Sequence, residues 1–175
     1  RMIAAGLKSG GWSVFCKTTG TVPRLIGTDG VERPLRRRGK ANIREQARVM
    51  RMAVREHAQV LVIECMAVDP FLQEISQRKI VRSDIGVITN VRLDHTEEMG
   101  LTLEEICDSL SRTIPEHGIL YTADTQFWGQ MVRNAEKVGA RVELSRPADD
   151  LPNFDFPENV ALALAVCGEL GVDRE

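Results

Sequence analysis

Residues 60–70 read Val-Leu-Val-Ile-Glu-Cys-Met-Ala-Val-Asp-Pro, and this stretch decides the fold class. Its first four residues are apolar and favour β structure, so they predict a strand that is buried on both faces. Glu64 follows where that strand should end. In open α/β sheets, ligands lie beyond the carboxyl ends of the strands, so Glu64 is a candidate ligand for a metal or a substrate cation. The alternative is that Glu64 caps the next helix, because helix N-termini favour negative charge.

A second apolar run, residues 85–89 (Ile-Gly-Val-Ile-Thr), favours the first interpretation. It leads directly into a polar loop that carries Asn90, Asp94 and His95. Parallel strands deliver their carboxyl ends to the same side of a sheet. We therefore expect Glu64 and His95 to lie on one edge of the sheet.

The composition bounds the class of protein. With 175 residues, 43% of them hydrophobic and 5% aromatic, the chain is expected to form one well-buried domain. The formal net charge of −2 does not fit a general polyanion binder. Four cysteines lie far apart without a CxxC pair, which is typical of reduced, mostly buried cysteines in a cytosolic protein. No apolar run approaches the roughly 18 residues of a membrane span, so we expect a soluble protein.

The two ends of the chain predict that it is part of a larger polypeptide. The first eight residues have apolar side chains at helical spacing but no N-cap. The last predicted helix, residues 158–171, is rich in Ala and Leu and ends at a glycine four residues before the chain does.

Strand and helix predictions alternate along the chain. Beyond the two runs above, strands are predicted at residues 12–16, 119–122 and, at a sheet edge, 141–144. Helices are predicted at residues 70–80 and 126–138, and after a capping box formed by Thr102 and Glu105. This order predicts an α/β fold with a mostly parallel, right-handed sheet and flanking helices.

A basic region follows the first strand. Residues 27–40 combine turn formers with arginines and predict an exposed loop or hairpin. Within it, three adjacent arginines without acidic partners suggest an anionic ligand such as nucleotide phosphate, a polycarboxylate or nucleic acid: Arg36, Arg37 and Arg38. The next segment is predicted to be an amphipathic helix with an apolar stripe of Ile43, Ala47, Met50 and Val54. Its arginines, Arg48, Arg51 and Arg55, are interpreted as a solvated surface.

Residues 17–21 (Lys-Thr-Thr-Gly-Thr) look like the end of a phosphate-binding P-loop. The upstream glycine and spacer of that motif are missing, so a P-loop at this position is rejected. A hydroxyl- and glycine-rich loop after a strand can still contact phosphate or a metal-bound carboxylate, and the alternative is an ordinary turn.

Five segments together resemble poly-γ-glutamate synthase, the capsule-type amide ligase of the Mur ligase superfamily. They are residues 17–21, 38–46, 64–67, 86–91 (with 94–95 and 99–100) and 157–159 with the Ala-rich helix that follows. The resemblance spans nearly the whole chain. It implies that residues 1–175 form a single partial central ATPase domain, related to P-loop NTPases. Such a domain would lack its upstream phosphate loop and the C-terminal domain, so the fragment itself is expected to be inactive.

The resemblance also implies a reaction. Such ligases use ATP to convert a carboxylate into an acyl phosphate, which an amine then attacks to form an amide. Glu64 would hold Mg²⁺ beside the phosphates, and His95 would help to hold a second divalent ion, with Mn²⁺ tolerated. Asp94 would be a ligand or would orient His95.

Further roles follow from the same resemblance. Asn159 and Asn90 would contact the nucleotide. From the residues themselves, the loop after the first strand and the arginine cluster are the candidates for contact with phosphate or an anionic substrate: Lys17, Thr18, Thr19, Arg36, Arg37 and Arg38. The implied partners are glutamate, a poly-γ-glutamate acceptor and membrane-associated synthesis and export proteins. A homo-oligomer is a further possibility, and nucleic acid is not an expected partner. The implied location is the cytoplasm, including the cytoplasmic face of the membrane.

Three alternatives remain open. The first is another Mur-type ligase, for folyl-polyglutamate or cell-wall peptides. Cell-wall enzymes carry a carbamate-modified lysine beyond the Asp-His motif, whereas this chain has no lysine between Lys79 and Lys137. The second is a nucleic-acid-binding module built on residues 33–55, which lacks interleaved stacking aromatics. The third is an assembly interface.

Overall fold

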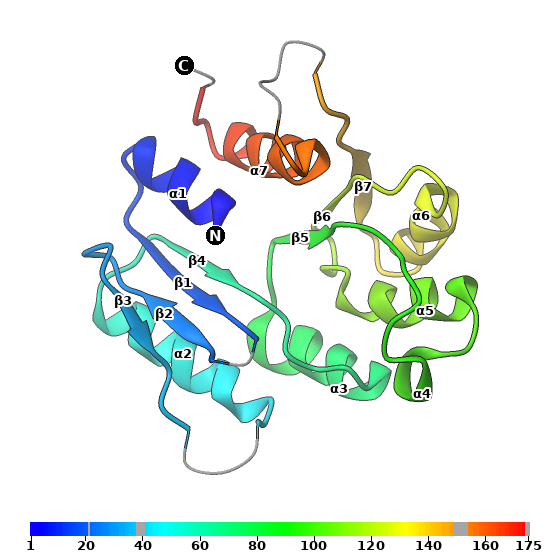
Figure 1. The fold of residues 1–175 in the computed structure, drawn as a ribbon, viewed down its shortest axis with the longest axis horizontal. Helices are drawn as coiled ribbons and strands as arrows, with labels where there is room; N and C mark the ends of the chain where they lie inside the picture. Colours follow the sequence, from blue (N-terminus) through cyan, green and yellow to red (C-terminus); the bar gives the residue numbers. More distant parts are fainter. Residues whose placement is uncertain (21, 38–40, 149–153, 174–175) are drawn as a thin grey trace. The chain divides into compact units, whose positions relative to one another are not determined.

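The computed structural model describes residues 1–20, 22–37, 41–148 and 154–173 (Figure 1). The chain divides into two compact units, the first made of Arg1–Met66 with Cys167–Glu175 and the second of Ala67–Val166. Each unit has its own sheet and its own buried apolar side chains. This arrangement confirms the predicted α/β class, while the assignment of residues 1–175 to a single ATPase domain stays a prediction. None of the described helices is long and apolar enough to span a lipid bilayer.

The first unit contains a four-stranded sheet with the order β3-β2-β1-β4. Its strands are β1 (Val14–Thr18), β2 (Arg24–Ile26), β3 (Glu32–Pro34) and β4 (Val60–Ile63). β1 and β4 are parallel, whereas β2 pairs antiparallel with both β1 and β3. The β2–β3 turn includes Gly30 at φ +80°, a backbone conformation that glycine adopts at no steric cost. The hairpin predicted within residues 27–40 is therefore confirmed for its described part.

Helices cover both faces of this sheet (Figure 1). Because side chains alternate along a strand, Val14 and Cys16 of β1 pack with α1 (Met2–Ser9) and with Cys167 of α7 (Pro157–Glu169). Phe15 points the other way and packs with Val49 and Ala53 of α2 (Arg44–Arg55). The alternation gives the unit its helix–sheet–helix layers.

The buried face of α2 differs from the predicted apolar stripe. Gln46, Val49 and Ala53 are buried, whereas Val54 of the predicted stripe is 73% exposed. Successive residues of a helix are about 100° apart, so a stripe shifted by one residue faces a different direction. The predicted stripe is wrong at Val54, whereas Ile43, Ala47 and Met50 are half-buried beside the buried face.

The prediction for residues 60–64 needs two corrections. β4 forms as expected, but all four of its residues are only half-buried, since it is the end strand of its sheet. β4 is also not paired with the strand at residues 85–88, which belongs to a different sheet in the second unit. A common sheet edge for Glu64 and His95 is therefore not present among the described residues.

The second unit contains a fully parallel sheet with the order β5-β6-β7. These strands are Ile85–Ile88, Ile119–Thr122 and Arg141–Leu144, and β7 lies at the edge as predicted. The helices are α3 (Pro70–Ile75), which continues into a π-helical turn (Ser76–Val81), α4 (Thr96–Met99), α5 (Leu103–Leu110), a short 3₁₀ turn (Ser111–Thr113) and α6 (Trp128–Glu136). All predicted helices of this unit are present, with ends shifted by a few residues.

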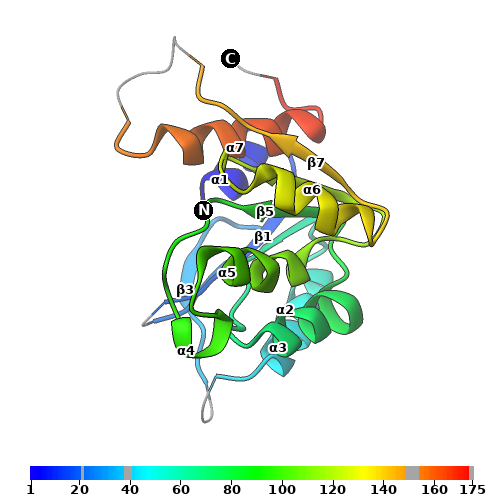
Figure 2. The same ribbon diagram turned by 90° about the vertical axis from the view of Figure 1, so that its right-hand side faces the viewer.

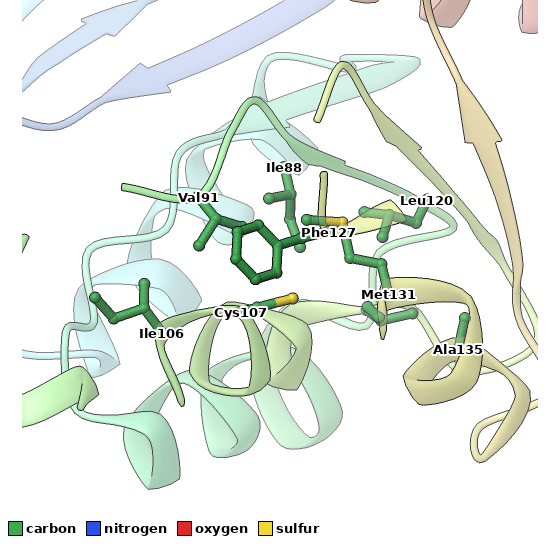
Figure 3. Packing of buried hydrophobic residues seen from close by; sticks show 9 residues of the cluster. Ile88, Val91, Ile106, Cys107, Leu120, Phe127, Met131 and Ala135 are labelled. Atoms are coloured by element: carbon green, nitrogen blue, oxygen red, sulfur yellow. The ribbon is translucent and has the colours of Figure 1, made fainter. Parts of the chain in front are cut away.

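The core of the second unit joins its sheet to two neighbouring helices, α5 and α6 (Figure 2). Figure 3 shows Phe127 and Met131 of the α6 region beside Ile88 of β5 and Leu120 of β6. Cys107 of α5 is fully buried in the same cluster. This packing fixes the starting points of the loops that follow β5 and β6.

The predicted capping box at the start of α5 is confirmed. The backbone N–H of Glu105 donates to Thr102 Oγ1 at 3.2 Å, and the backbone N–H of Thr102 donates to Glu105 Oε2 at 3.0 Å. These two bonds satisfy donors that have no partner within the helix.

Candidate functional site

Glu64 lies directly beyond β4, at the carboxyl edge of the first sheet. Its backbone N–H donates to the carbonyl of Lys17 at 3.0 Å, which extends the β1–β4 ladder by one residue. Its exposed side chain turns toward the loop after β1, where Oε2 accepts a hydrogen bond of 2.6 Å from the backbone N–H of Thr19. Parallel strands end on the same side of a sheet, so residues 17–19 and Glu64 meet there.

The alternative role of Glu64 as a helix cap is taken by another residue. Asp69 occupies the N-cap of α3, and its Oδ1 accepts a hydrogen bond from the backbone N–H of Leu72 at 2.9 Å. Pro70 follows at the first helical position. The carboxylate of Glu64 is therefore not needed to begin this helix, and it stays at the sheet edge.

Lys17 is buried beneath this edge, with 1% of its surface exposed. Its ammonium donates to the backbone carbonyl of Glu64 at 3.3 Å and lies 3.7 Å from Glu45 Oε1. Burial lowers the pKa of Lys17, whereas the negative charge of Glu45 acts in the opposite direction. An ammonium in this position holds the end of β4 from inside. Its burial does not favour the direct phosphate contact that the sequence predicts for Lys17.

Glu45, in the first turn of α2, joins Lys17 to Arg37. The guanidinium of Arg37 makes two hydrogen bonds with Glu45, from Nε to Oε2 at 2.6 Å and from Nη2 to Oε1 at 3.1 Å. Burial alone would raise the pKa of Glu45, but the hydrogen bonds and charge of Arg37, together with Lys17, lower it on balance. The half-buried carboxylate of Glu45 lies between two cations and stays ionised, which neutralises the charge of the buried Lys17.

This arrangement corrects the interpretation of the three adjacent arginines. Arg37 has an acidic partner, Glu45, within the unit. This pair could not be predicted from the sequence, because the two residues are eight positions apart. Arg36 is exposed, and Arg38 lies outside the described residues. The three arginines therefore do not act as one equivalent cluster.

Gln46 is a second donor to the same carbonyl and was not predicted from the sequence. Its side chain is 1% exposed, and Nε2 donates to the backbone carbonyl of Glu64 at 3.3 Å. Its Oε1 is buried and has no hydrogen-bond partner among the described residues. Lys17 and Gln46 together fix the backbone of Glu64, while Thr19 fixes its carboxylate.

The loop after β5 carries the second group of predicted residues, and all of them are exposed: Asn90, Asp94 and His95. His95 has a left-handed backbone at φ +49°, and its backbone N–H donates to Asp94 Oδ1 at 2.8 Å. The same oxygen lies 3.8 Å from His95 Nε2. Asp94 is thus placed beside His95, and its role as a metal ligand or as a residue that orients His95 stays a prediction.

Asp124, beyond β6, holds this loop and was not singled out from the sequence. Its Oδ2 accepts a hydrogen bond of 2.7 Å from the backbone N–H of Val91, and its Oδ1 accepts one of 2.8 Å from that of Phe127. One carboxylate therefore joins the loop after β5 to the start of α6. Asp124 could have been predicted from the sequence, because it is an acid that lies two residues past the predicted strand at residues 119–122.

The remaining predicted residues have simple positions. Thr18 ends β1 and is half-buried, and Asn159 lies half-buried in the first turn of α7. The first unit contains six of the predicted site residues: Lys17, Thr18, Thr19, Arg36, Arg37 and Glu64. The second unit contains four others: Asn90, Asp94, His95 and Asn159. The metal region shared by Glu64 and His95 stays a prediction.

Similarity to solved structures defines the class of fold. E. coli FolC in complex with DHPP and ADP matches with a TM-score of 0.67 at 14% identity, over 99% of this chain and 50% of that chain. A bifunctional folylpolyglutamate synthase/dihydrofolate synthase with Mn, AMPPNP and L-glutamate bound matches with a TM-score of 0.64 at 15% identity, over 99% of this chain and 51% of that chain. The fold is of the Mur ligase type, as the sequence predicted.

Sequence similarity defines the nearer relationship. Over its whole length the chain is 39% identical to the capsule biosynthesis protein CapB of Bacillus anthracis and 39% identical to the PGA synthase CapB of Bacillus subtilis strain 168. It spans 40% and 47% of the length of these two relatives. No protein-family profile matches the chain. The predicted resemblance to the capsule-type poly-γ-glutamate synthases is confirmed.

Proposed function

We propose that the protein containing this chain is an ATP-dependent ligase that joins glutamate residues through amide bonds into a γ-linked polymer. The observation that carries this proposal is the 39% identity to two CapB proteins along the entire chain. One of those relatives is named a capsule biosynthesis protein and the other a PGA synthase. Because the chain spans less than half of each relative, the activity is proposed for the whole protein.

The donor set at the edge of the first sheet fits a magnesium ion. Mg²⁺ prefers hard oxygen ligands and is usually bound by one or two carboxylates together with waters and substrate phosphates. Glu64 offers such a carboxylate, exposed and oriented by Thr19. Among the described residues, no group of three or more His, Cys, Asp or Glu side chains could hold a metal by itself. Glu64 would therefore bind Mg²⁺ together with waters and substrate phosphates.

The residues around Glu64 would hold this ligand in a fixed orientation. Lys17 and Gln46 both donate to its carbonyl, so the backbone cannot turn without breaking two partly buried hydrogen bonds. Pre-oriented ligands reduce the reorganisation that a reaction requires. When bound, ATP with its divalent ion would supply the phosphoryl group that activates the acceptor carboxylate as an acyl phosphate.

The second unit would supply further contacts. His95, with Asp94 beside it, would help to bind a second divalent ion, and Asn90 and Asn159 would contact the nucleotide. The nucleotides, manganese and L-glutamate named for two solved structures of the same fold support a nucleotide and divalent-metal requirement in general. We propose glutamate and the growing γ-linked polymer as the substrates.

Replacing Glu64 tests the proposal. Glu64→Gln keeps the shape of the side chain and removes the negative charge that a hard cation requires, so ATP-dependent incorporation of labelled glutamate should fall at least about a hundredfold. Glu32→Gln is the matched control, because Glu32 is a surface acid of the same unit that pairs with Arg1 and Arg24. Activity of the control should stay within about twofold of the unmodified protein.

Two results would contradict the proposal. One is near-normal incorporation by Glu64→Gln at ordinary magnesium concentration. The other is transfer of glutamate to a folate acceptor with no formation of γ-linked polymer, which would favour the folylpolyglutamate alternative.

A further inference from the structure

The outer face of α2 carries four arginines in a single line: Arg44, Arg48, Arg51 and Arg55. Their spacing of four, three and four residues places them on one side of a helix with 3.6 residues per turn. All four are exposed, and they lie opposite the buried face formed by Gln46, Val49 and Ala53. We call this line the arginine stripe. At a rise of 1.5 Å per residue it is about 16 Å long.

The arginine stripe lacks the acidic partners that several other arginines of the first unit have. Arg1 pairs with Glu32, Arg33 with Asp29, and Arg37 with Glu45. None of the four stripe arginines forms an ion pair with a described acidic residue. Like charges at this helical spacing repel each other and destabilise the helix. An external anion would relieve that repulsion.

The arginine stripe begins next to the candidate site. Arg44 precedes Glu45 and Gln46, which hold Lys17 and the carbonyl of Glu64. Arg48 Nη1 donates to the backbone carbonyl of Arg36 at 3.2 Å, so the exposed Arg36 lies beside the stripe. The line of positive charge therefore runs from the carboxyl edge of the first sheet toward the other end of α2.

We propose that the arginine stripe binds the γ-linked glutamate polymer during its synthesis, as a track for the chain outside the reacting centre. This inference rests on the proposed function for the nature of the polymer. Guanidinium groups bind carboxylates in a planar, two-pronged geometry, and the polymer carries one carboxylate on every repeat. A single exposed ion pair contributes little, but several made by one molecule add up through effective concentration.

A linear polycarboxylate fits this surface better than two other polyanions do. Helices that bind membranes place Trp, Phe or Leu opposite their basic face, where they enter the lipid, whereas the corresponding face of α2 is buried against the sheet. Single-stranded nucleic acid requires aromatic side chains for base stacking, and α2 has none. The arginine stripe therefore presents a line of positive charge without the apolar or aromatic side chains that a membrane or single-stranded nucleic acid would require.

The test measures binding of a fluorescently labelled γ-linked glutamate polymer to the purified full-length protein without nucleotide. The variant is Arg48→Ala/Arg51→Ala/Arg55→Ala, since alanine keeps the helix and removes three charges. Polymer affinity should fall about tenfold or more, and the dependence of affinity on salt should become weaker. Monomeric glutamate should not compete measurably, because it cannot contact several arginines at once.

Two control variants test whether the position of the charges and the planar shape of the guanidinium group matter for polymer binding. Arg82→Ala/Arg133→Ala/Arg146→Ala removes the same charge from exposed positions of the second unit and should leave polymer affinity within about twofold. Arg48→Lys/Arg51→Lys/Arg55→Lys keeps the charge and should lose only part of the affinity, because lysine lacks the planar fork.

Several outcomes would overturn the inference. They are unchanged polymer affinity in the triple alanine variant, an equal loss in the second-unit control, and selective binding of phosphatidylserine vesicles or single-stranded DNA by the arginine stripe in place of the polymer. Failure of the proposed function is a separate result, since it would appear as absent ATP-dependent incorporation of glutamate, whereas polymer binding is measured without catalysis.

Discussion

The end of β4 and the loop after β5 both carry predicted site residues, but the protein holds them in different ways. Glu64 follows its strand directly and is fixed through both its backbone and its carboxylate by Lys17, Gln46 and Thr19. His95 lies seven residues beyond β5 in an exposed loop that is anchored near its start by Asp124. The comparison shows one predicted ligand that is held by buried side chains and another that lies in an exposed loop held by the carboxylates of Asp94 and Asp124.

The difference has a chemical meaning. Buried ionic groups must all keep their partners, so any change in the Lys17–Glu45–Arg37 group should affect the whole first unit. A surface loop makes fewer contacts and can change its conformation at lower cost. We infer that the Glu64 side is rigid and that the His95 side adapts when ligands bind.

The largest expected effect comes from removing the charge that neutralises Lys17. Glu45→Ala leaves an ammonium with a fully buried side chain and without its carboxylate, so the free energy of unfolding should fall by about 3 kcal/mol. Lys17→Met should lower the free energy of unfolding by less, because Glu45 still pairs with Arg37 and the carbonyl of Glu64 still accepts a hydrogen bond from Gln46. Chemical denaturation of both variants measures the difference.

A double variant and the pH dependence check the same interaction. Glu45→Ala/Lys17→Met should be more stable than Glu45→Ala alone, because the unpaired ammonium is gone. The pKa of Glu45 is lowered in the folded protein, so its stabilising contribution is present above the unfolded value of about 4.3 and is lost as the pH falls through the lower folded value. Glu45→Gln should therefore flatten the acid limb of the stability curve. An unchanged acid limb would contradict this account.

A smaller and more local effect is expected in the second unit. Asp124→Ala removes the acceptor for the backbone N–H groups of Val91 and Phe127, and hydrogen bonds to a charged group contribute about 1.5–3 kcal/mol. We expect the free energy of unfolding to fall by about 2 kcal/mol and hydrogen exchange to quicken at the Val91 amide. Asp108→Ala is a suitable control, since the donors to its carboxylate among the described residues are the side chains of Gln130 and Asn134. Equal exchange at Val91 in both variants would argue against the anchoring role of Asp124.

Much of the fold could be predicted because its signals are local. The strand at residues 119–122, the edge strand at 141–144 and the capping box of Thr102 and Glu105 are set by hydrophobic pattern and by short-range hydrogen bonding. The division into two sheets was missed, because two apolar runs carry no information about whether they pair with each other.

The sequence singled out Glu64 as a candidate site residue but did not indicate which residues hold it in place. Glu64 stands out because an acid follows an apolar strand. Glu45 and Gln46 do not stand out, because a charged and a polar residue in the first turn of a helix are ordinary on a solvated surface. Their function depends on contacts with Lys17 and Glu64, which are distant in the sequence.

The smallest effect on stability is expected at Gln46, and it would sharpen the comparison most. Its Oε1 is buried without a partner among the described residues, so removing the amide also removes a desolvated group. Gln46→Met keeps a similar volume, and the free energy of unfolding should therefore change by less than about 1 kcal/mol. The carbonyl of Glu64 would keep only Lys17, so the magnesium concentration for half-maximal glutamate incorporation should rise about threefold while the Tm stays nearly constant. A large loss of stability with unchanged magnesium dependence would show that Gln46 serves only the core of the first unit.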